Sequence, residues 1–266
     1  MRISVVTISF NQARFLETAI NSIVGQGYPN LEYVVVDPGS SDGSREVIDK
    51  YRDQIGKTIL DPDEGPADGL NKGFACATGE ILAFVNADDE LLPNSLQYVA
   101  EFFSEHPGVD VLLGSGPIVD ESGDVSRHIV PSRFSLPHYA YSRFEFIQQG
   151  VFFRRSVFES IGGFNKSNRI SWDGELLVDM VVAGARLART EKELGVFRIY
   201  PSSISGSATY TQKLALENAR LFQKIMGRGS RWYDPVLGLM LLASKWILDP
   251  WYVYWRLVRN FAITKS

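Results

Sequence analysis

Residues 79–94 read Gly-Glu-Ile-Leu-Ala-Phe-Val-Asn-Ala-Asp-Asp-Glu-Leu-Leu-Pro-Asn, and this stretch decides the fold that the sequence predicts. The apolar run at 81–85 is short and rich in β-forming residues, which is typical of a strand buried on both faces of a parallel sheet. The run gives way to two adjacent acids, Asp88 and Asp89. Ligands of open α/β sheets bind beyond the carboxyl ends of the strands, so these acids mark a candidate site.

The two acids favour a divalent cation. Adjacent carboxylates repel each other, and proteins tolerate them where a hard cation with oxygen ligands lies between them. We therefore interpret Asp88 and Asp89 as a Mn²⁺ or Mg²⁺ site that bridges to the diphosphate of a nucleotide. The alternative, which the stretch by itself leaves open, is a solvated acidic turn that caps the next helix.

Length and composition limit the classes of protein that remain. A chain of 266 residues forms one large domain or a domain with an appendage. The net charge of -4 argues against a nucleic-acid partner, because such proteins usually carry a basic stripe. The single cysteine, Cys76, excludes an internal disulfide and fits a reducing compartment. The first apolar run stops at Asn11 without a cleavage pattern, so we expect a cytoplasmic protein.

The first half of the chain alternates strands and helices. This alternation predicts a mostly parallel, Rossmann-like sheet with helices on both faces. The predicted strands are residues 2–9, 31–37, 57–61, 80–86 and 109–114, and the predicted helices are residues 12–26, 43–54, 66–77 and 93–105. The strands then end at one edge of the sheet, where we expect the site.

The second half has a different pattern. We predict a hairpin at 117–130, a strand at 144–154 that runs into a short helix, a helix at 173–184, an interrupted strand at 187–200 and a charged amphipathic helix at 209–226. Residues 1–205 are predicted to form the main domain, with halves at 1–115 and 116–205, and residues 206–266 a C-terminal helical region.

Residues 232–263 concentrate aromatic side chains. They include Trp232, Trp246, Trp251 and Trp255, four of the five tryptophans. Their apolar part is too short to cross a bilayer, and Pro250 interrupts it. Aromatic residues and cations beside apolar residues suit a helix in the membrane interface, here the cytoplasmic face of the inner membrane. The alternative is an arm that packs on the core or on a partner subunit of a homo-oligomer.

Four polar segments fall at the predicted edge of the sheet. They are Val6-Thr7-Ile8-Ser9-Phe10-Asn11, Val34-Val35-Val36-Asp37-Pro38-Gly39-Ser40-Ser41-Asp42-Gly43-Ser44, Asp63-Glu64-Gly65-Pro66-Ala67-Asp68-Gly69-Leu70-Asn71-Lys72-Gly73 and Asn86-Ala87-Asp88-Asp89. In this order they resemble the nucleotide-sugar domain of the family-2 glycosyltransferases of GT-A fold. The resemblance covers residues 2 to about 185. It implies an inverting, metal-dependent hexosyltransferase that moves a sugar from a nucleotide diphosphate donor, a UDP-sugar, to a glycan or lipid-linked acceptor in cell-surface polysaccharide synthesis.

The resemblance assigns the donor site. In the family an aspartate at the end of the second strand accepts a hydrogen bond from uracil, and Asp37 matches it. The alternative for Asp37 is a cap for the following turn. The further nucleotide contacts are Thr7, Ser9, Asn11, Asp68, Lys72, Asn86, Ala87 and Asp88. The chain departs from the family at the metal-binding DxD motif, which corresponds to Asn86-Ala87-Asp88, so we assign the cation to Asp88 and Asp89.

The resemblance also assigns the acceptor site. In the family an aspartate that opens a helix deprotonates the acceptor hydroxyl, and Asp173 matches it. Attack from the face opposite the phosphate then inverts the anomeric centre. Gln149, Trp172 and Glu175 are the expected contacts to the sugar and the acceptor. The alternative for Asp173 is a plain N-cap.

Two other functions compete with this hypothesis. A sugar nucleotidyltransferase shares the α/β sheet and the acidic pair, but it should carry a glycine-rich phosphate loop after the first strand, and Ser9-Phe10-Asn11-Gln12 is not such a loop. A catalytically silent sugar-binding scaffold is suggested only by Asn86 in place of an acid.

Overall fold

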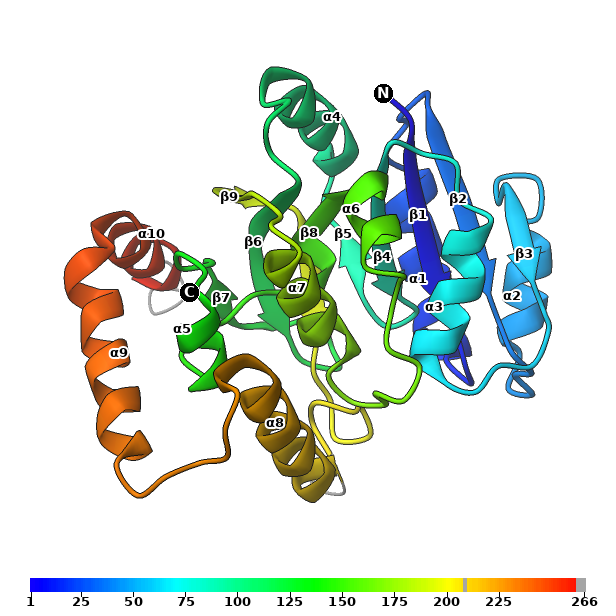
Figure 1. Cartoon of the computed structure of the whole chain (residues 1–266). Helices are drawn as coiled ribbons and strands as arrows, with labels where there is room; N and C mark the ends of the chain where they lie inside the picture. Colours follow the sequence, from blue (N-terminus) through cyan, green and yellow to red (C-terminus); the bar gives the residue numbers. More distant parts are fainter. Residues whose placement is uncertain (208–209, 262–266) are drawn as a thin grey trace.

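The computed structural model describes residues 1–207 and 210–261 and shows a twisted central sheet with helices on both faces (Figure 1). The strand order is β3-β2-β1-β4-β8-β6-β10-β5, with β7 and β9 paired to β6. This arrangement confirms the predicted α/β class. Of the predicted C-terminal region 206–266, residues 208–209 and 262–266 lie outside the described residues, and so do the start of the helix predicted at 209–226 and the end of the segment 232–263.

The first half forms the parallel part of the sheet. Its strands are β1 Ile3–Ile8, β2 Leu31–Val36, β3 Lys57–Ile59 and β4 Ile81–Asn86, and its helices are α1 Ala13–Val24, α2 Ser44–Lys50 and α3 Pro66–Ala75. β1 lies between β2 and β4, and all three run parallel. In this register Ile8 pairs with Val36 on one side and with Asn86 on the other. The loops that follow these three strands therefore leave the sheet at one edge, as predicted.

The middle of the chain differs in part from the prediction. Its elements are β5 Glu90–Leu91, α4 Ser95–Glu105, β6 Val111–Val119, β7 Val125–Ile129, α5 Leu136–Ala140, the 3-10 helix η1 Gln148–Gly150, β8 Val151–Arg154 and α6 Arg155–Ser160. The β6–β7 hairpin is confirmed, although β6 extends beyond the predicted end. Residues 144–147 are not a strand, which corrects the prediction for 144–154, because pairing with β6 begins only at Val151, after η1.

β8 was not predicted in its place between β4 and β6. It runs antiparallel to both strands. Phe152 and Phe153 are each 0% exposed, and they point to opposite faces of the sheet and into different core clusters. Burial of each such side chain stabilises the fold by about 1.5–3 kcal/mol, so β8 joins the two layers of the core.

The last third of the described chain contains α7 Trp172–Val182, β9 Leu187–Glu193, β10 Gly195–Arg198, α8 Thr211–Met226, α9 Asp234–Leu248 and α10 Pro250–Phe261. The predicted break in the strand at 187–200 is confirmed at Leu194, where the pairing partner of β6 changes from β9 to β10. In Figure 1 α9 and α10 lie at the margin of the molecule opposite β3.

No single helix among the described residues is long and apolar enough to cross a membrane. Helices α9 and α10 together have the length and composition of a membrane span, but they are bent by 84° at their junction.

The contact of α3 with the sheet requires a residue without a side chain at Gly73. A Cβ atom there would lie 2.4 Å from Cγ1 of Val6 and 3.2 Å from Cγ2 of Val36. We expect Gly73→Ala to lower the free energy of unfolding by about 1–2 kcal/mol, because overpacking outweighs the gain in helix propensity. Chemical denaturation measures this change.

The matched control is Gly238→Ala in α9, where the nearest atoms lie 3.5 Å from the added Cβ. There we expect unchanged or increased stability, by up to about 1 kcal/mol. Equal effects of the two substitutions would contradict the close packing of α3 on β1 and β2.

Candidate active site

The loops after β1 and β2 form one rim at the carboxyl edge of the sheet. The Asn11 backbone N–H donates to Ser40 Oγ at 2.8 Å, and the Ser41 N–H donates to Asn11 Oδ1 at 2.9 Å. Asn11 adopts a left-handed backbone, φ 54°, which an asparagine tolerates better than most residues. The Ala13 N–H at the start of α1 donates to Asp42 Oδ2 at 2.9 Å. Asn11 thus supports the rim through its own side chain.

Asp37 divides its two carboxylate oxygens between two roles. The side chain is 0% exposed, and Oδ1 accepts hydrogen bonds from the backbone of Gly39 and Ser40 and from Arg45 Nε, at 3.1, 2.8 and 3.2 Å. Oδ2 is buried and has no hydrogen-bond partner among the described residues. Ser9 Oγ, at the end of the neighbouring strand, is buried without a partner in the same way. Buried acceptors without donors are costly, so this rim suits a ligand that brings donors.

Thr7 does not present its hydroxyl at the rim. The side chain is 0% exposed, and Oγ1 accepts a hydrogen bond from Tyr33 Oη at 3.0 Å inside the core. The sequence correctly placed Thr7 on the first strand. Because side chains alternate between the two faces of a strand, however, that of Thr7 points into the core and not toward the rim.

Asp68 lies at the centre of a cluster of charges at the start of α3. Its Oδ1 is 2.6 Å from Lys166 Nζ, and its Oδ2 is 3.1 Å from Lys72 Nζ. The hydrogen bond from Lys166, together with those from the Glu64 N–H and Lys72, overcomes burial and lowers the pKa of Asp68 to about 2. Lys72 is therefore paired with Asp68, as its helical spacing predicts, and it also donates to the Pro62 carbonyl.

Asp88 and Asp89 face different partners. Asp89 is 1% exposed, and its Oδ1 accepts the Arg198 N–H at 2.9 Å. Its Oδ2 accepts from Asn86 Nδ2 at 3.0 Å and from Gln149 Nε2. Burial, with the nearby charge of Asp88, raises the pKa of Asp89 well above its ordinary value. The structure therefore turns Asp89 toward the core, where it joins the β4 loop, η1 and the end of β10.

The Asp88 carboxylate lies at the edge of this cluster. Its Oδ2 accepts a hydrogen bond from Tyr200 Oη at 2.9 Å, and its main-chain carbonyl accepts from Arg198 Nε at 3.1 Å. Burial raises the pKa of Asp88 above its ordinary value, although the bond from Tyr200 opposes the shift. The sequence analysis missed Arg198 and Tyr200, which lie far along the chain and carry no recognisable motif of their own.

Two further acceptors in this cluster, Asn86 Oδ1 and Gln149 Oε1, are buried and receive no hydrogen bond from the part of the chain that the structure describes. Ala87 is 1% exposed and its N–H donates to the Ile8 carbonyl at 3.1 Å, so it joins the β4 loop to β1. The predicted contacts Asn86, Ala87, Asp88 and Gln149 are thus brought together, with unsatisfied oxygens among them.

The oxygen ligands available at this edge fit a cation that is shared with a substrate. Among residues 1–207 and 210–261 no group of three or more His, Cys, Asp or Glu side chains converges as a self-sufficient metal site. Mg²⁺ is usually held by one or two carboxylates together with substrate phosphates and water. Asp88, with the amide oxygen of Asn86 nearby, supplies this kind of partial ligand set.

Asp173 lies in the first turn of α7 beside two aromatic residues. Burial raises the pKa of Asp173 above its ordinary value. The hydroxyl of Tyr139 on α5 lies so close to Gly174 that a Cβ there would be 1.9 Å from Tyr139 Oη. Trp172 is 8% exposed, and its buried Nε1–H has no acceptor among the described residues. A carboxylate with a raised pKa is suited to accept a proton from a bound hydroxyl.

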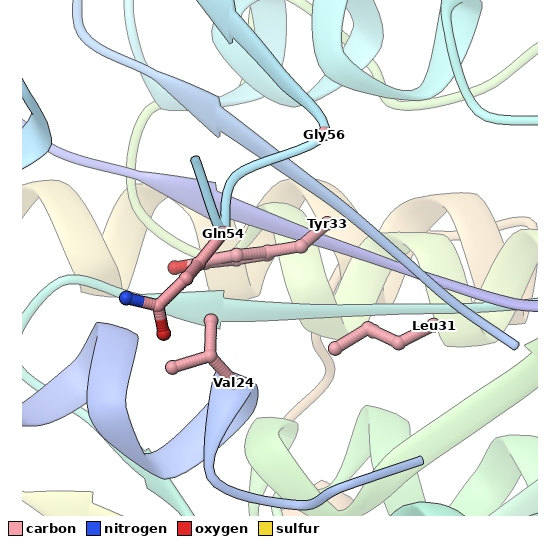
Figure 2. A pocket seen from close by; sticks show the side chains of 5 residues that line it. All are labelled: Val24, Leu31, Tyr33, Gln54 and Gly56. Atoms are coloured by element: carbon pink, nitrogen blue, oxygen red, sulfur yellow. The ribbon is translucent and has the colours of Figure 1, made fainter. Parts of the chain in front are cut away.

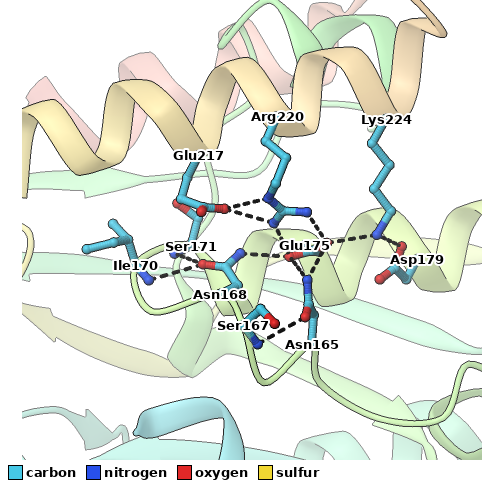
Figure 3. A network of polar contacts seen from close by, with 10 residues as sticks. All are labelled: Asn165, Ser167, Asn168, Ile170, Ser171, Glu175, Asp179, Glu217, Arg220 and Lys224. Carbon is cyan, nitrogen blue, oxygen red and sulfur yellow. Dashed lines mark hydrogen bonds and ion pairs between the residues drawn. The ribbon is translucent and has the colours of Figure 1, made fainter.

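Glu175 is surrounded by donors (Figure 3). It is 1% exposed, and it accepts from both terminal nitrogens of Arg220, from Lys224 Nζ at 2.8 Å, from Asn168 Nδ2 at 2.8 Å and from Asn165 Nδ2 at 3.2 Å. Burial alone would raise the pKa of Glu175, but these hydrogen bonds, led by those from Arg220 and Lys224, lower it to about 2. The carboxylate joins α7 to α8 and has little capacity left for the acceptor contact that the sequence assigned to it.

Comparisons with known proteins identify the family. A family model described as Glycosyl transferase family 2 matches residues 4–162. The chain belongs to glycosyl transferase family 2. A glycosyltransferase of Nostoc sp. that is named as uncharacterized is 30% identical over 218 residues, which are 78% of this chain and 68% of the relative. A PGL/p-HBAD biosynthesis glycosyltransferase of Mycobacterium tuberculosis is 31% identical over 180 residues, 64% of this chain and 66% of the relative. The chain thus spans about two thirds of the length of these relatives.

Solved structures show the same fold. TarS from S. aureus, residues 1–349 in complex with UDP-GlcNAc, superposes with a TM-score of 0.71 at 19% identity and covers 98% of this chain and 74% of that one. The mannosyltransferase PcManGT from Pyrobaculum calidifontis, in complex with GDP-Man and Mn²⁺, gives a TM-score of 0.65 at 19% identity, over 100% of this chain and 75% of that one. The predicted GT-A fold of this family-2 glycosyltransferase is confirmed.

A pocket of about 270 Å³ lies elsewhere, between Val24, Leu31, Tyr33, Gln54 and Gly56 (Figure 2). These residues come from the carboxyl end of α1 and from around the amino ends of β2 and β3, the edge of the sheet opposite Asp37 and Asp88. The titratable group among these five residues is Tyr33, whose hydroxyl bonds to Thr7.

The Glu175 cluster makes stability depend on pH in a defined direction. The pKa of Glu175 is lowered from 4.5 to about 2, so its contribution is complete above pH 4.5 and is lost as the pH falls toward 2. We expect Glu175→Gln to lower the free energy of unfolding by about 1–3 kcal/mol at neutral pH, with a difference from the unsubstituted protein that shrinks below pH 4.5. Denaturation curves at several pH values measure the difference.

Glu217→Gln is the matched control, because Glu217 pairs with the same Arg220 but its side chain is 22% exposed. An exposed pair contributes up to about 1 kcal/mol, so this variant should change little. A pH-independent effect of Glu175→Gln would show that the charge of Glu175 is not what joins α8 to α7.

Proposed function

We propose that this family-2 glycosyltransferase is an inverting enzyme that transfers a sugar from a UDP-sugar, bound with a divalent cation, to a hydroxyl deprotonated by Asp173. The observation that carries the proposal is the free, buried Oδ2 of Asp37 at the same edge of the sheet as the Asp88 carboxylate. We divide the chain into a nucleotide-sugar half at 1–115, an acceptor half at 116–205 and a helical region at 206–266.

The donor side is argued from acceptors that lack donors. Uracil offers a ring N–H, and a carboxylate oxygen without a partner is a suitable acceptor for it. Asp37 Oδ2 and Ser9 Oγ are such atoms, held in place because Asp37 Oδ1 is already bonded to the loop. The complexes of TarS with UDP-GlcNAc and of PcManGT with GDP-Man support a nucleotide sugar as the ligand.

The cation is argued from Asp88. When bound there with the diphosphate, a Mn²⁺ or Mg²⁺ ion would neutralise the negative charge that develops on the leaving group. Asp88 would hold the ion, and Asn86 would contact the nucleotide or the ion through its free Oδ1. Asp89, bonded to Asn86 Nδ2 on the core side, would orient the loop. The Mn²⁺ in the PcManGT complex supports this assignment.

The acceptor side is argued from Asp173. Its carboxylate takes the proton of the acceptor hydroxyl while the hydroxyl oxygen forms a bond to the anomeric carbon. The bond from that carbon to the diphosphate oxygen breaks, and the diphosphate leaves with the electron pair. Attack opposite the leaving group inverts the configuration. The raised pKa of Asp173 makes it a stronger base than an exposed aspartate.

The acceptor is proposed to be a glycan or a lipid-linked glycan of the cell surface. The M. tuberculosis relative is named for the biosynthesis of PGL/p-HBAD, and a relative in Bacillus subtilis is named as a putative teichuronic acid biosynthesis glycosyltransferase. Trp172, with an unpaired Nε1–H, offers both an apolar face and a donor to a sugar ring.

The first test uses Asp173→Asn. The purified protein with Mn²⁺ and a panel of nucleotide sugars and acceptors should release nucleoside diphosphate and form an inverted product, measured by a coupled assay and by proton NMR of the anomeric signal. The variant should lose at least about 100-fold in rate, because the general base is gone, while its affinity for the nucleotide stays the same.

Asp179→Asn is the control, because it removes one negative charge from a position further along the same helix, α7. Transfer retained by Asp173→Asn would remove Asp173 from its role. No release of diphosphate from any donor would favour the catalytically silent scaffold.

The second test uses Asp88→Asn. Calorimetry should show that Mn²⁺ strengthens UDP binding to the unsubstituted protein, and that the variant loses most of this strengthening because its carboxylate is gone. Asp61→Asn removes an exposed acid near the same edge and should leave the metal effect intact. Identical metal dependence in Asp88→Asn and Asp61→Asn would contradict the cation site.

A further inference from the structure

Helix α9 has its charged side chains inside and its apolar side chains outside. Asp234 at its start is 5% exposed and bonds to Arg228 and Tyr141, and Lys245 is 7% exposed and donates to the Arg143 carbonyl at 3.0 Å. The exposed residues of α9 are Pro235, Val236, Leu237, Leu239, Met240, Ala243, Trp246, Ile247 and Leu248, and none of them is charged or polar. A surface helix of a water-soluble protein normally has the reverse arrangement.

Helix α10 repeats this arrangement. Arg256 Nη1 donates to Glu145 Oε2 at 3.1 Å, and Arg259 Nη2 donates to the Glu191 carbonyl at 3.2 Å, so both cations turn toward the body of the protein. On the other side Tyr254, Leu257 and Val258 are exposed. We call the exposed residues of α9 together with these three the outer face.

The corner between the two helices protrudes. Ile247 and Leu248, immediately before the bend at Asp249, are 74% and 78% exposed, the highest values among the valine, leucine and isoleucine side chains described. Trp246 and Tyr254 flank the corner, and Trp232, which is 90% exposed, precedes α9. Tryptophan and tyrosine at the border of an apolar patch are typical of a membrane–water interface.

The shape of the outer face argues against a second copy of the chain as its occupant. The two helices are bent by 84° at a corner whose side chains protrude. A stable protein interface needs a partner surface of complementary shape, which a second protruding corner does not offer. A lipid surface requires neither a fixed shape nor a minimum area, because each aliphatic side chain that enters it contributes separately.

We propose that the outer face docks the protein on a lipid surface by inserting apolar side chains, without a need for anionic headgroups. Anionic lipid would be contacted by the cations of α9 and α10, which are Lys245, Arg256 and Arg259. In the structure each of them donates a hydrogen bond to an acceptor of the protein itself. Docking therefore depends on apolar contact and is insensitive to salt.

The outer face is near the acceptor side of the site. Helix α5 contacts α9 through His138, whose Nε2 lies 3.2 Å from the Leu241 carbonyl, and the next residue, Tyr139, lies against Gly174 beside Asp173. One short helix thus separates a lipid-facing surface from the start of α7. The docking itself does not depend on the proposed reaction.

Flotation with vesicles tests the proposal. The full chain should float with vesicles of neutral phosphatidylcholine as well as with vesicles that contain phosphatidylglycerol, equally at about 0.1 M and 1 M salt, where the Debye length falls from about 10 to 3 Å. The double variant Ile247→Glu with Leu248→Glu should lower the partition coefficient about 100-fold, because two aliphatic side chains no longer enter the lipid. Leu239→Glu with Met240→Glu should act in the same way.

The matched control is Val182→Glu with Leu216→Glu, two exposed apolar residues of α7 and α8 outside the outer face, which should float like the unsubstituted chain. Melting curves without lipid verify that every variant is folded, as expected for exposed positions. Flotation only with anionic vesicles and only at low salt would overturn the proposal in favour of electrostatic binding. Flotation with no vesicle would also overturn it, and a dimer in sedimentation that the Ile247 and Leu248 variant dissociates would then identify a second copy as the occupant. Unchanged flotation of both outer-face variants would overturn it as well.

Discussion

The arrangement of the site depends on one buried carboxyl group, Asp89. Three donors from distant parts of the chain converge on it: the Arg198 N–H from β10, Gln149 Nε2 from η1 and Asn86 Nδ2 from the end of β4. Because Asp89 faces inward, its neighbour Asp88 is held at the edge of the cluster. One acid of the pair thus serves the structure, and the other is left free for the cation of the proposed function.

The rim of the sheet stores unsatisfied hydrogen-bonding capacity. Among the described residues, Asp37 Oδ2, Ser9 Oγ, Asn86 Oδ1 and Gln149 Oε1 are buried acceptors without donors, and Trp172 Nε1, at the start of α7, is a buried donor without an acceptor. Each costs the isolated protein about 1–3 kcal/mol, which a ligand with matching groups would recover. Rigid partners hold these atoms in position, as the bonds to Asp37 Oδ1 illustrate, so the ligand finds the site already formed.

Much of the fold followed from local patterns. The short apolar runs that form β1, β2 and β4 predicted the parallel half of the sheet and the edge where we expected the site. A buried strand and the turn residues that follow it can be recognised from a few consecutive residues of the sequence. The insertion of β8 was not predictable, since its partners Leu82 and Leu112 are determined by long-range packing. The site shows the same division. Asp37 and Asp88 lie at the predicted edge. The sequence could not show, however, that Lys166 would form an ion pair with Asp68 or that Arg220 would form one with Glu175. Nor could it show that Asp89 would turn inward.

The ion pairs of Glu175 bear on where this chain can be divided. Arg220 and Lys224 are on α8, beyond position 205, yet they neutralise a carboxylate that is 1% exposed on α7. A shortened protein that ends before α8 would leave this carboxylate without its two cationic partners, two residues from Asp173. Fragments for expression should therefore keep α7 and α8 together, and a fusion partner is better attached after the C-terminal helices than in place of them.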